Sequence, residues 1–271
     1  MTIDDQPTLR FFSTNVEALF RVADVTGDAT HGVTEMTTGA WLSDERGRAC
    51  RGSLGVVMDD VMGHLVSSAT PEGQWSVSTE IHLDFIDNPP TDGSVLHAES
   101  TLITRGANGG LAGGRVVDSD GRLIVSGSTR LQNVAIAQEP RAVRRTPDAL
   151  RDRREARSIG ELLGAVQRRE DGATRLELGP SEFIANPLGN IHGGVLLCAS
   201  EMTGMSALPA AADFHTTSIH IAYLRPCPAD EQVTFVPKVL HHGRSLGVVQ
   251  VMGLNRVGKI CTTATVTSHS P

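Results

Sequence analysis

Two buried helices are predicted from long apolar segments, one in each half of the chain. The segments are residues 52–66 (GSLGVVMDDVMGHLV) and 193–208 (GGVLLCASEMTGMSAL), and both are apolar on most faces. Each nonetheless carries acids near its centre, which are Asp59 and Asp60 in the first and Glu201 in the second. Because a buried charge is costly without a partner, we expect these acids to have a specific structural or functional role.

Alternating, β-branched runs follow each helical segment and predict consecutive antiparallel strands. Residues 78–85 (STEIHLDF) resemble residues 216–223 (TTSIHIAY), with Ile-His at the same place in both. A proline-containing turn follows each run and leads into two further strand-like segments. A turn in which glycine precedes a basic residue then leads into the last strand. The order in each half therefore predicts an α+β unit whose antiparallel sheet wraps around one central helix.

The repeat divides the chain into three parts. We expect an N-terminal repeat at residues 1–138, an arginine-rich linker at 139–158 and a C-terminal repeat at 159–271. Seven arginines lie in the linker, from Arg141 to Arg157. We favour a solvated linker over an anion-binding site, because runs of charge usually face water.

Composition and charge narrow the class of protein. Hydrophobic residues make up 39% of the 271 residues and charged residues 20%, which is typical of a globular protein with a sizeable core. The N-terminus lacks the pattern of a secretory signal, no apolar run approaches the ~20 residues that span a bilayer, and the four cysteines form no CxxC pair. We therefore expect a cytoplasmic protein without a membrane partner. The net charge of −7 argues against nucleic-acid binding.

Residues 186–194 (NPLGNIHGG) carry the most specific motif. The pattern Asn-x-x-Gly-x-x-His-Gly-Gly enters the second helical segment, and an acid, Glu201, follows nine residues after the histidine. This pattern resembles the hotdog thioesterases of the PaaI and 4-hydroxybenzoyl-CoA type, and the resemblance covers nearly all of residues 176–268. The first half resembles a diverged copy, in which ERGRACRGS replaces the motif and its Asn, Gly and His-Gly-Gly are missing.

The resemblance implies a double hotdog fold and an acyl-CoA thioesterase that releases a carboxylic acid and CoA. Two helices would lie side by side, with two sites across their interface. A helix N-terminus offers free N–H groups, and glycine permits close approach of a thioester carbonyl. By resemblance, Gly193 N–H is the oxyanion donor beside Gly194, His192 shapes the loop, and Asn186 orients water or the thioester.

The resemblance also implies that the acid comes from the opposing helix, so the motif of the second repeat should face the first. We choose Asp59 as general base or nucleophile because aligning Gly52 with Gly194 places it on Glu201. Its helical neighbours support the choice, since they are apolar and small and would raise its pKa. Asp60, whose neighbours are more polar, is the alternative. The mirror site would join Glu201 to the segment around Gly52. We expect that site to be degenerate, since Arg51 precedes the glycine.

Contacts with the substrate are less specific in the sequence. By resemblance, Arg225, Arg244 and Ser245 are candidates for contact with CoA phosphates, with plain surface roles as the alternative. His64 is a candidate for lining the acyl pocket, although a structural role is favoured. We expect no metal and no cofactor besides the CoA thioester substrate, because no metal motif accompanies the histidines.

Two other functions remain open. A non-catalytic acyl-CoA-binding or regulatory protein would explain the diverged first-half loop. An enoyl-CoA hydratase ranks last, because the downstream Asp and His pattern of such enzymes is absent although Asn186-Pro187 is present. The sequence leaves the acyl group open, and we expect double-hotdog units to pair further as homo-oligomers.

Overall fold

The first half of the chain contains seven strands in the part that the structure describes. The fold comes from a computed structural model, described here for residues 9–11, 15–136, 150–170, 173–209 and 213–270. The elements are β1 (Leu9–Phe11), α1 (Asn15–Leu19), β2 (Val25–Gly27), β3 (His31–Thr37), the 3-10 helices η1 (Ala40–Leu42) and η2 (Arg51–Leu54), α2 (Gly55–Ser67), β4 (Gln74–Phe85), β5 (Val95–Gly106), β6 (Gly109–Val117) and β7 (Leu123–Ala135).

The second half repeats this order with one strand fewer among the described residues. Its elements are α3 (Arg151–Arg154), α4 (Ile159–Leu163), β8 (Ala165–Glu170), β9 (Ala173–Leu178), the 3-10 helix η4 (Glu182–Ile184), α5 (Gly193–Ser206), β10 (His215–Tyr223), β11 (Val233–His242), β12 (Leu246–Leu254) and β13 (Ile260–His269). The α+β double hotdog expected from the sequence is confirmed.

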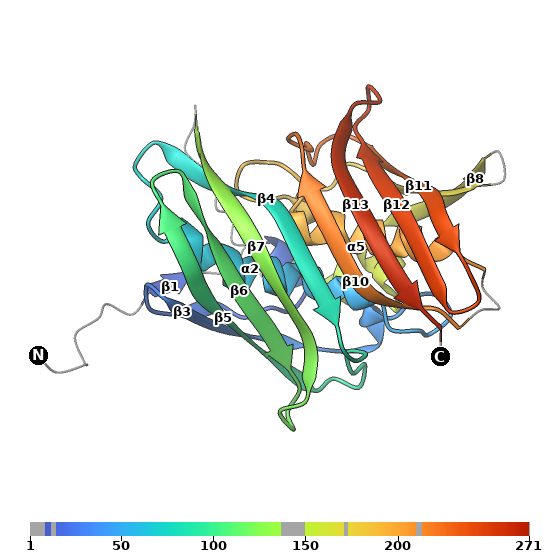
Figure 1. The fold of residues 1–271 in the computed structure, drawn as a ribbon, viewed down its shortest axis with the longest axis horizontal. Helices are drawn as coiled ribbons and strands as arrows, with labels where there is room; N and C mark the ends of the chain where they lie inside the picture. The colour runs from blue at the N-terminus through green and yellow to red at the C-terminus, as the bar shows by residue number, and fades with distance from the viewer. Residues whose placement is uncertain (1–8, 12–14, 137–149, 171–172, 210–212, 271) are drawn as a thin grey trace, which may run out of the picture.

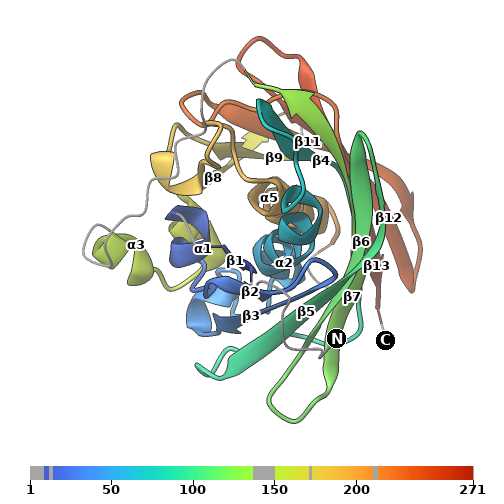
Figure 2. The ribbon, with the colours of Figure 1, turned by 90° about the vertical axis from the view of Figure 1, so that its left-hand side faces the viewer.

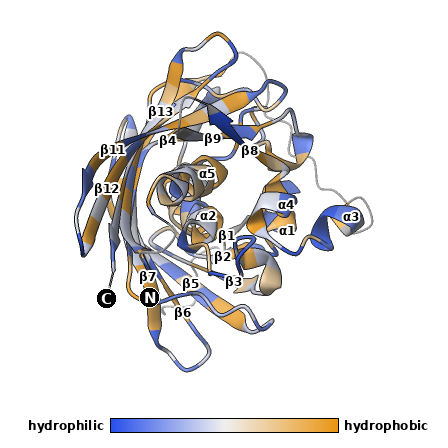
Figure 3. Ribbon diagram, turned by 90° about the vertical axis from the view of Figure 1, so that its right-hand side faces the viewer, coloured by the Kyte–Doolittle hydropathy of each residue, from blue (hydrophilic) through white to orange (hydrophobic). Residues whose placement is uncertain are grey.

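All thirteen described strands belong to one antiparallel sheet, in the order β1-β2-β3-β5-β6-β7-β4-β10-β13-β12-β11-β9-β8. The sheet curves around α2 and α5, which lie side by side inside it (Figure 2). Burial alternates along strands such as β3 and β12, and the strands accordingly show mixed blue and orange bands in Figure 3. The inner residues of both repeats form one hydrophobic core with the helices.

The two repeats join where β4 pairs with β10, near the middle of the sheet (Figure 1). His220 lies opposite His82 in this pairing, so the Ile-His segments recognised in the sequence meet each other across the seam. The flanking residues pair symmetrically about these two histidines, Ile81 with Ile221 and Leu83 with Ile219, as a pseudo-twofold axis through the histidine pair requires. This relation places the start of each long helix beside the middle of the other.

Close contact between α2 and α5 depends on glycine. A Cβ atom added to Gly194 would lie 2.4 Å from the backbone oxygen of Gly55, and one added to Gly55 would lie 2.9 Å from the backbone oxygen of Gly194. Such distances are shorter than side-chain carbons tolerate. Absence of side chains at these two positions thus lets the helices approach closely enough for the Gly194 amide of α5 to reach Asp59 of α2.

Part of the predicted linker can be placed. Residues 139–149 lie outside the described residues, whereas residues 150–158 contain α3. An Nη atom of Arg154 donates to the backbone oxygen of Ala18 at 2.8 Å, and the backbone N–H of Ile159 donates to Ser43 at 2.9 Å. This end of the linker therefore packs on the first repeat. The helices of the described segments are all too short or too polar to cross a bilayer.

Candidate active site

The loop before α5 is held by its own side chains. Asn186 Oδ1 accepts hydrogen bonds from two backbone N–H groups of the loop, at 3.0 and 3.1 Å. Gly189 has a φ of 77°, which glycine adopts without strain. His192 follows as the N-cap of α5, and its Nδ1 accepts from the Gly194 N–H at 3.1 Å. Asn186 thus shapes the loop, and its expected contact with water or thioester remains a prediction.

Asp59 meets this loop from α2. Its Oδ2 accepts the Gly194 N–H at 3.0 Å and lies 3.4 Å from His192 Nδ1. Its Oδ1 accepts a hydrogen bond from Ser78 Oγ of β4 at 2.8 Å. The residue is 8% exposed. An acid of the first repeat therefore faces the His-Gly-Gly loop of the second, whereas the contribution of Ser78 was not predicted.

Gly193 lies between the acid and a tyrosine. No hydrogen-bond acceptor for its N–H occurs among the described residues, so this amide is available to a ligand. A Cβ atom here would lie 2.6 Å from Asp59 Oδ2, which only glycine avoids. Tyr223 Oη donates to the Gly193 carbonyl at 2.7 Å. Burial and the charge of Asp59 raise the pKa of Tyr223 well above its usual value, so the phenol stays protonated as a donor.

Asp60 pairs with His64 of its own helix. His64 Nε2 lies 2.8 Å from Asp60 Oδ1, one helical turn along α2. Burial raises the pKa of Asp60, which is 6% exposed, although His64 opposes the rise. Burial lowers the pKa of His64, but the neighbouring Asp60 outweighs it and the net pKa is raised. Asp60 is therefore a buried acid paired with a half-buried histidine, and Asp59 is the acid in contact with Gly193.

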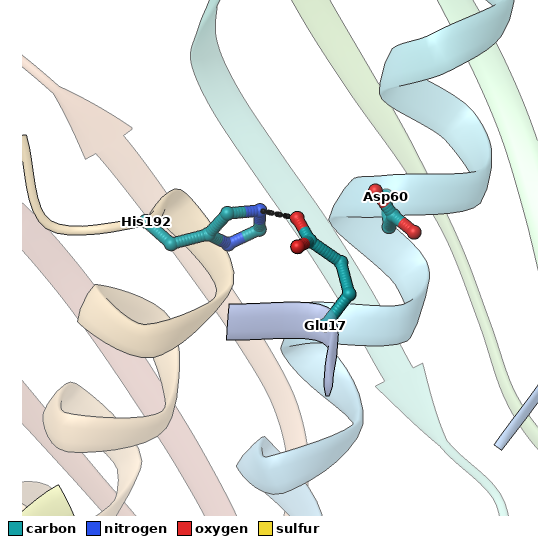
Figure 4. A group of neighbouring side chains, drawn as sticks. All are labelled: Glu17, Asp60 and His192. Atoms are coloured by element: carbon teal, nitrogen blue, oxygen red, sulfur yellow. Dashed lines mark ion pairs between the residues drawn. The ribbon is translucent and has the colours of Figure 1, made fainter. Parts of the chain in front are cut away.

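A third acid, Glu17 of α1, reaches the same loop from its other side. Its Oε1 lies 3.6 Å from His192 Nε2, and its side chain points toward the imidazole (Figure 4). Glu17 is 5% exposed. Glu17, Asp60 and His192 each offer a ligand atom within 4.8 Å of the others. The expectation that no metal binds stays a prediction. The position of Glu17 at this site was not predicted from the sequence.

The mirror centre retains its acid. Glu201 is 4% exposed, its Oε1 accepts from Thr216 Oγ1 at 2.8 Å, and its Oε2 accepts from Cys50 Sγ at 2.8 Å. Thr216 and Ser78 occupy matching positions of the repeated strands, so each acid has a hydroxyl donor. The acid-hydroxyl pair is therefore common to both centres.

One expectation about the first-half loop is wrong in part. Asp44 and Gly47 occupy the positions of the motif's Asn and Gly, which the sequence analysis took to be missing. Asp44 Oδ1 accepts from two backbone N–H groups of its loop, each at 2.9 Å, and Gly47 has a φ of 77°. An acid supports the same turn as an amide, because only the side-chain oxygen is used. What differs is the end of the motif, where Cys50 and Arg51 replace His and Gly.

The candidates for CoA phosphates lie away from these contacts. Arg225 is exposed and donates to the backbone oxygen of Ile260 at 2.6 Å. Arg244 and Ser245 are exposed in the turn between β11 and β12. Among the described residues, no hydrogen bond or ion pair joins the three to Asp59 or His192. Their role stays a prediction.

Comparison with known protein families shows which proteins this chain is related to. The sequence model of the Thioesterase superfamily matches residues 188–262, and that of the Acyl-CoA thioesterase C-terminal domain matches residues 2–128. The chain belongs to the thioesterase superfamily. The two matches fall in different halves, so each repeat of this thioesterase is recognised separately. A comparison with curated proteins found no match.

Solved structures with the same fold match along almost the whole chain. A TesB protein from Mycobacterium avium subspecies paratuberculosis has a TM-score of 0.63 at 11% identity, covering 95% of this chain and 98% of its own. Acyl-CoA thioesterase II TesB2 from Mycobacterium marinum has a TM-score of 0.60 at 12% identity, covering 94% and 98%. An acyl-ACP thioesterase from Bacteroides thetaiotaomicron has a TM-score of 0.58 at 11% identity, covering 88% and 97%. At these identities the similarity shows the fold.

Proposed function

We propose that this member of the thioesterase superfamily hydrolyses acyl-CoA to a carboxylic acid and CoA at the centre formed by Asp59 and the His192-Gly193-Gly194 loop. The observation that carries the proposal is the placement of a buried carboxylate beside an unused helix N-terminal amide, contributed by different repeats. Thioester hydrolysis requires both a base or nucleophile and a donor to the developing oxyanion.

The geometry supports a general-base route. The thioester carbonyl accepts the Gly193 N–H, and Asp59 takes a proton from a water molecule whose oxygen attacks the carbonyl carbon. The negative charge that develops on the carbonyl oxygen is stabilised by the Gly193 amide and the positive end of α5. Collapse of the tetrahedral intermediate breaks the C–S bond, and the departing thiolate takes the proton from Asp59.

Neighbouring groups keep the acid and the donor in place. Ser78 and the Gly194 N–H each donate to one oxygen of Asp59, which fixes its orientation. Tyr223 holds the Gly193 carbonyl, and therefore the peptide that precedes Gly194. Direct attack by Asp59 on the thioester is the second route, and the same contacts would orient the nucleophile.

The family matches favour hydrolysis over the rival functions. Both halves match thioesterase families, which supports neither a hydratase nor a protein limited to binding. CoA as the carrier is supported by the Acyl-CoA thioesterase domain match. A cytoplasmic location, pairing into homo-oligomers and the identity of the acyl group stay predictions.

The test is CoA release from a panel of alkyl and aryl acyl-CoAs. We expect Asp59→Asn to lower kcat by at least about 100-fold, the size of a typical general-base contribution, with little loss of thermal stability. Glu201→Gln is the matched control on the other helix and should retain most of the activity. Normal turnover by Asp59→Asn, or inactivation by Glu201→Gln alone, would show that the acid is misassigned.

A further inference from the structure

The mirror centre opens into a cavity. A cavity of about 1640 Å³ lies beside Glu201, between the first-half loop and the C-terminal end of α5. Cavities of roughly 300–1,000 Å³ hold ligands of drug size, so this one has room for an acyl chain together with part of a larger carrier. Its wall near Glu201 includes Cys50, Arg51 and Thr216, which are the counterparts of groups at the Asp59 centre.

Arg51 places a cation where the other centre has a glycine amide. The residue is 5% exposed, its Nε donates to Asn88 Oδ1 at 2.8 Å, and its Nη1 donates to the Thr216 carbonyl at 2.8 Å. These bonds use two of the five N–H donors of a guanidinium. Because Arg51 lines the cavity, the other donors can bind an oxygen of a ligand.

The charges near Arg51 favour a neutral acceptor. The carboxylate of Glu201 balances the guanidinium, so a second carboxylate would leave a net negative charge in a poorly solvated place. A thioester carbonyl accepts a hydrogen bond without adding charge. Farther along the cavity, apolar side chains can cover an acyl chain, and these are Met202, Met205, Leu208, Phe214 and Val239.

The rim of the cavity suits the other end of an acyl-CoA. Arg46 and Arg169 line it and are exposed, which allows contact with phosphate groups in water. Arg48 also lines it but is paired with Asp44 at 2.9 Å. In an acyl-CoA the carbonyl lies between the acyl chain and the phosphates. The cavity offers a buried donor for the carbonyl, apolar side chains for the chain and exposed arginines for the phosphates.

We propose that the Glu201 centre is a second acyl-thioester-binding site, in which the guanidinium of Arg51, at the position of Gly193, is the donor to the thioester carbonyl. The proposal rests on the proposed function for its ligand class. Each chain would then bind two acyl-CoA molecules, one at each of the two centres that the pseudo-twofold axis relates. The second molecule lies against α5, the helix whose N-terminus serves the Asp59 centre.

Binding stoichiometry tests the proposal. The probe is a ketone analogue of acyl-CoA in which a methylene replaces sulfur, measured by calorimetry and equilibrium dialysis. We expect two equivalents bound per wild-type chain and the loss of one in Arg51→Met. Ala207 lines the same cavity on α5's C-terminal side, so Ala207→Phe should narrow it and also lose one equivalent. This variant serves if Arg51→Met does not fold. Arg256→Met, on an exposed turn, is the matched control and should bind like wild type.

Stoichiometry separates this proposal from the proposed function. Retention of the wild-type stoichiometry by folded Arg51→Met and Ala207→Phe would overturn the second site, whatever their turnover. Conversely, Asp59→Asn tests hydrolysis, and its turnover does not alter the number of analogue molecules bound at the Glu201 centre. A single equivalent in wild type that is lost in Arg51→Met would support the second site while contradicting thioester binding beside Gly193.

Discussion

His192 lies between two acids, Asp59 and Glu17, and its hydrogen bond to Gly194 bears on its tautomer. With Nδ1 accepting the Gly194 N–H, the neutral ring is the tautomer with its proton on Nε2, which faces Glu17. We expect Glu17→Gln to lower kcat by roughly 10-fold or more, since a contact with a buried charged group contributes about 1.5–3 kcal/mol. Steady-state kinetics with Glu161→Gln as an exposed helical control would measure this. Equal kcat values for the two variants would contradict a positioning role for Glu17.

The Asp60–His64 pair predicts a pH dependence of stability. The pKa of His64 is raised in the folded state above its usual value of 6.5, so its contribution is fully present below pH 6.5. The contribution is lost as pH rises through the folded pKa, because the unfolded chain releases its proton first. Urea unfolding between pH 6 and 9 should show a fall in stability that is smaller in His64→Gln. Parallel curves for the two proteins would contradict this assignment.

At the scale of residues, the sequence predicted the contacts that one helix or one motif specifies. Asp59 could be chosen because its position relative to Glu201 follows from the repeat alone. Glu17, Ser78 and Tyr223 could not, because they reach the site from separate elements whose register a single sequence does not specify. An acid within the apolar stretch NVEALF was the available signal for Glu17.

The close contact between α2 and α5 predicts opposite effects on stability when alanine replaces two of the glycines. Alanine at Gly194 would place its Cβ 2.4 Å from a backbone atom of α2, so we expect a loss of about 1–3 kcal/mol or more. Gly63 of α2 has only Leu131 Cδ2 within reach, at 3.9 Å. Gly63→Ala should therefore stabilise by about 0.5–1 kcal/mol, because glycine is a poor helix former. Chemical denaturation measures both, and equal effects would contradict the packing described here.

The first residue of each long helix depends on local contacts that the hydrophobic pattern of the sequence does not specify. The second begins at Gly193 as expected, since the His192 side chain caps the Gly194 N–H. The first was expected from Gly52, but a 3-10 turn occupies residues 51–54 and α2 begins at Gly55. Cys50 forms no side-chain cap there. The long apolar segments therefore predicted the helices, whereas the local capping chemistry determined where the first one begins.

A continuous sheet and one shared core predict that the two repeats unfold together. Both tryptophans, Trp41 and Trp75, lie in the first repeat, so their fluorescence reports on that half alone. Far-UV circular dichroism reports on the whole chain. We expect the two signals to give the same denaturation midpoint, which is the behaviour of a single cooperative unit. A second dichroism transition without a fluorescence change would show that the repeats unfold separately.

A structure of the complex with the ketone analogue would show whether a thioester carbonyl binds beside Gly193. We expect the analogue's carbonyl oxygen to lie within hydrogen-bond distance, about 2.7–3.2 Å, of the Gly193 nitrogen. We also expect the carbonyl carbon to face Asp59, with a water molecule or carboxylate oxygen in line for attack. An analogue bound only at the Glu201 centre, with its carbonyl remote from Gly193, would contradict the account.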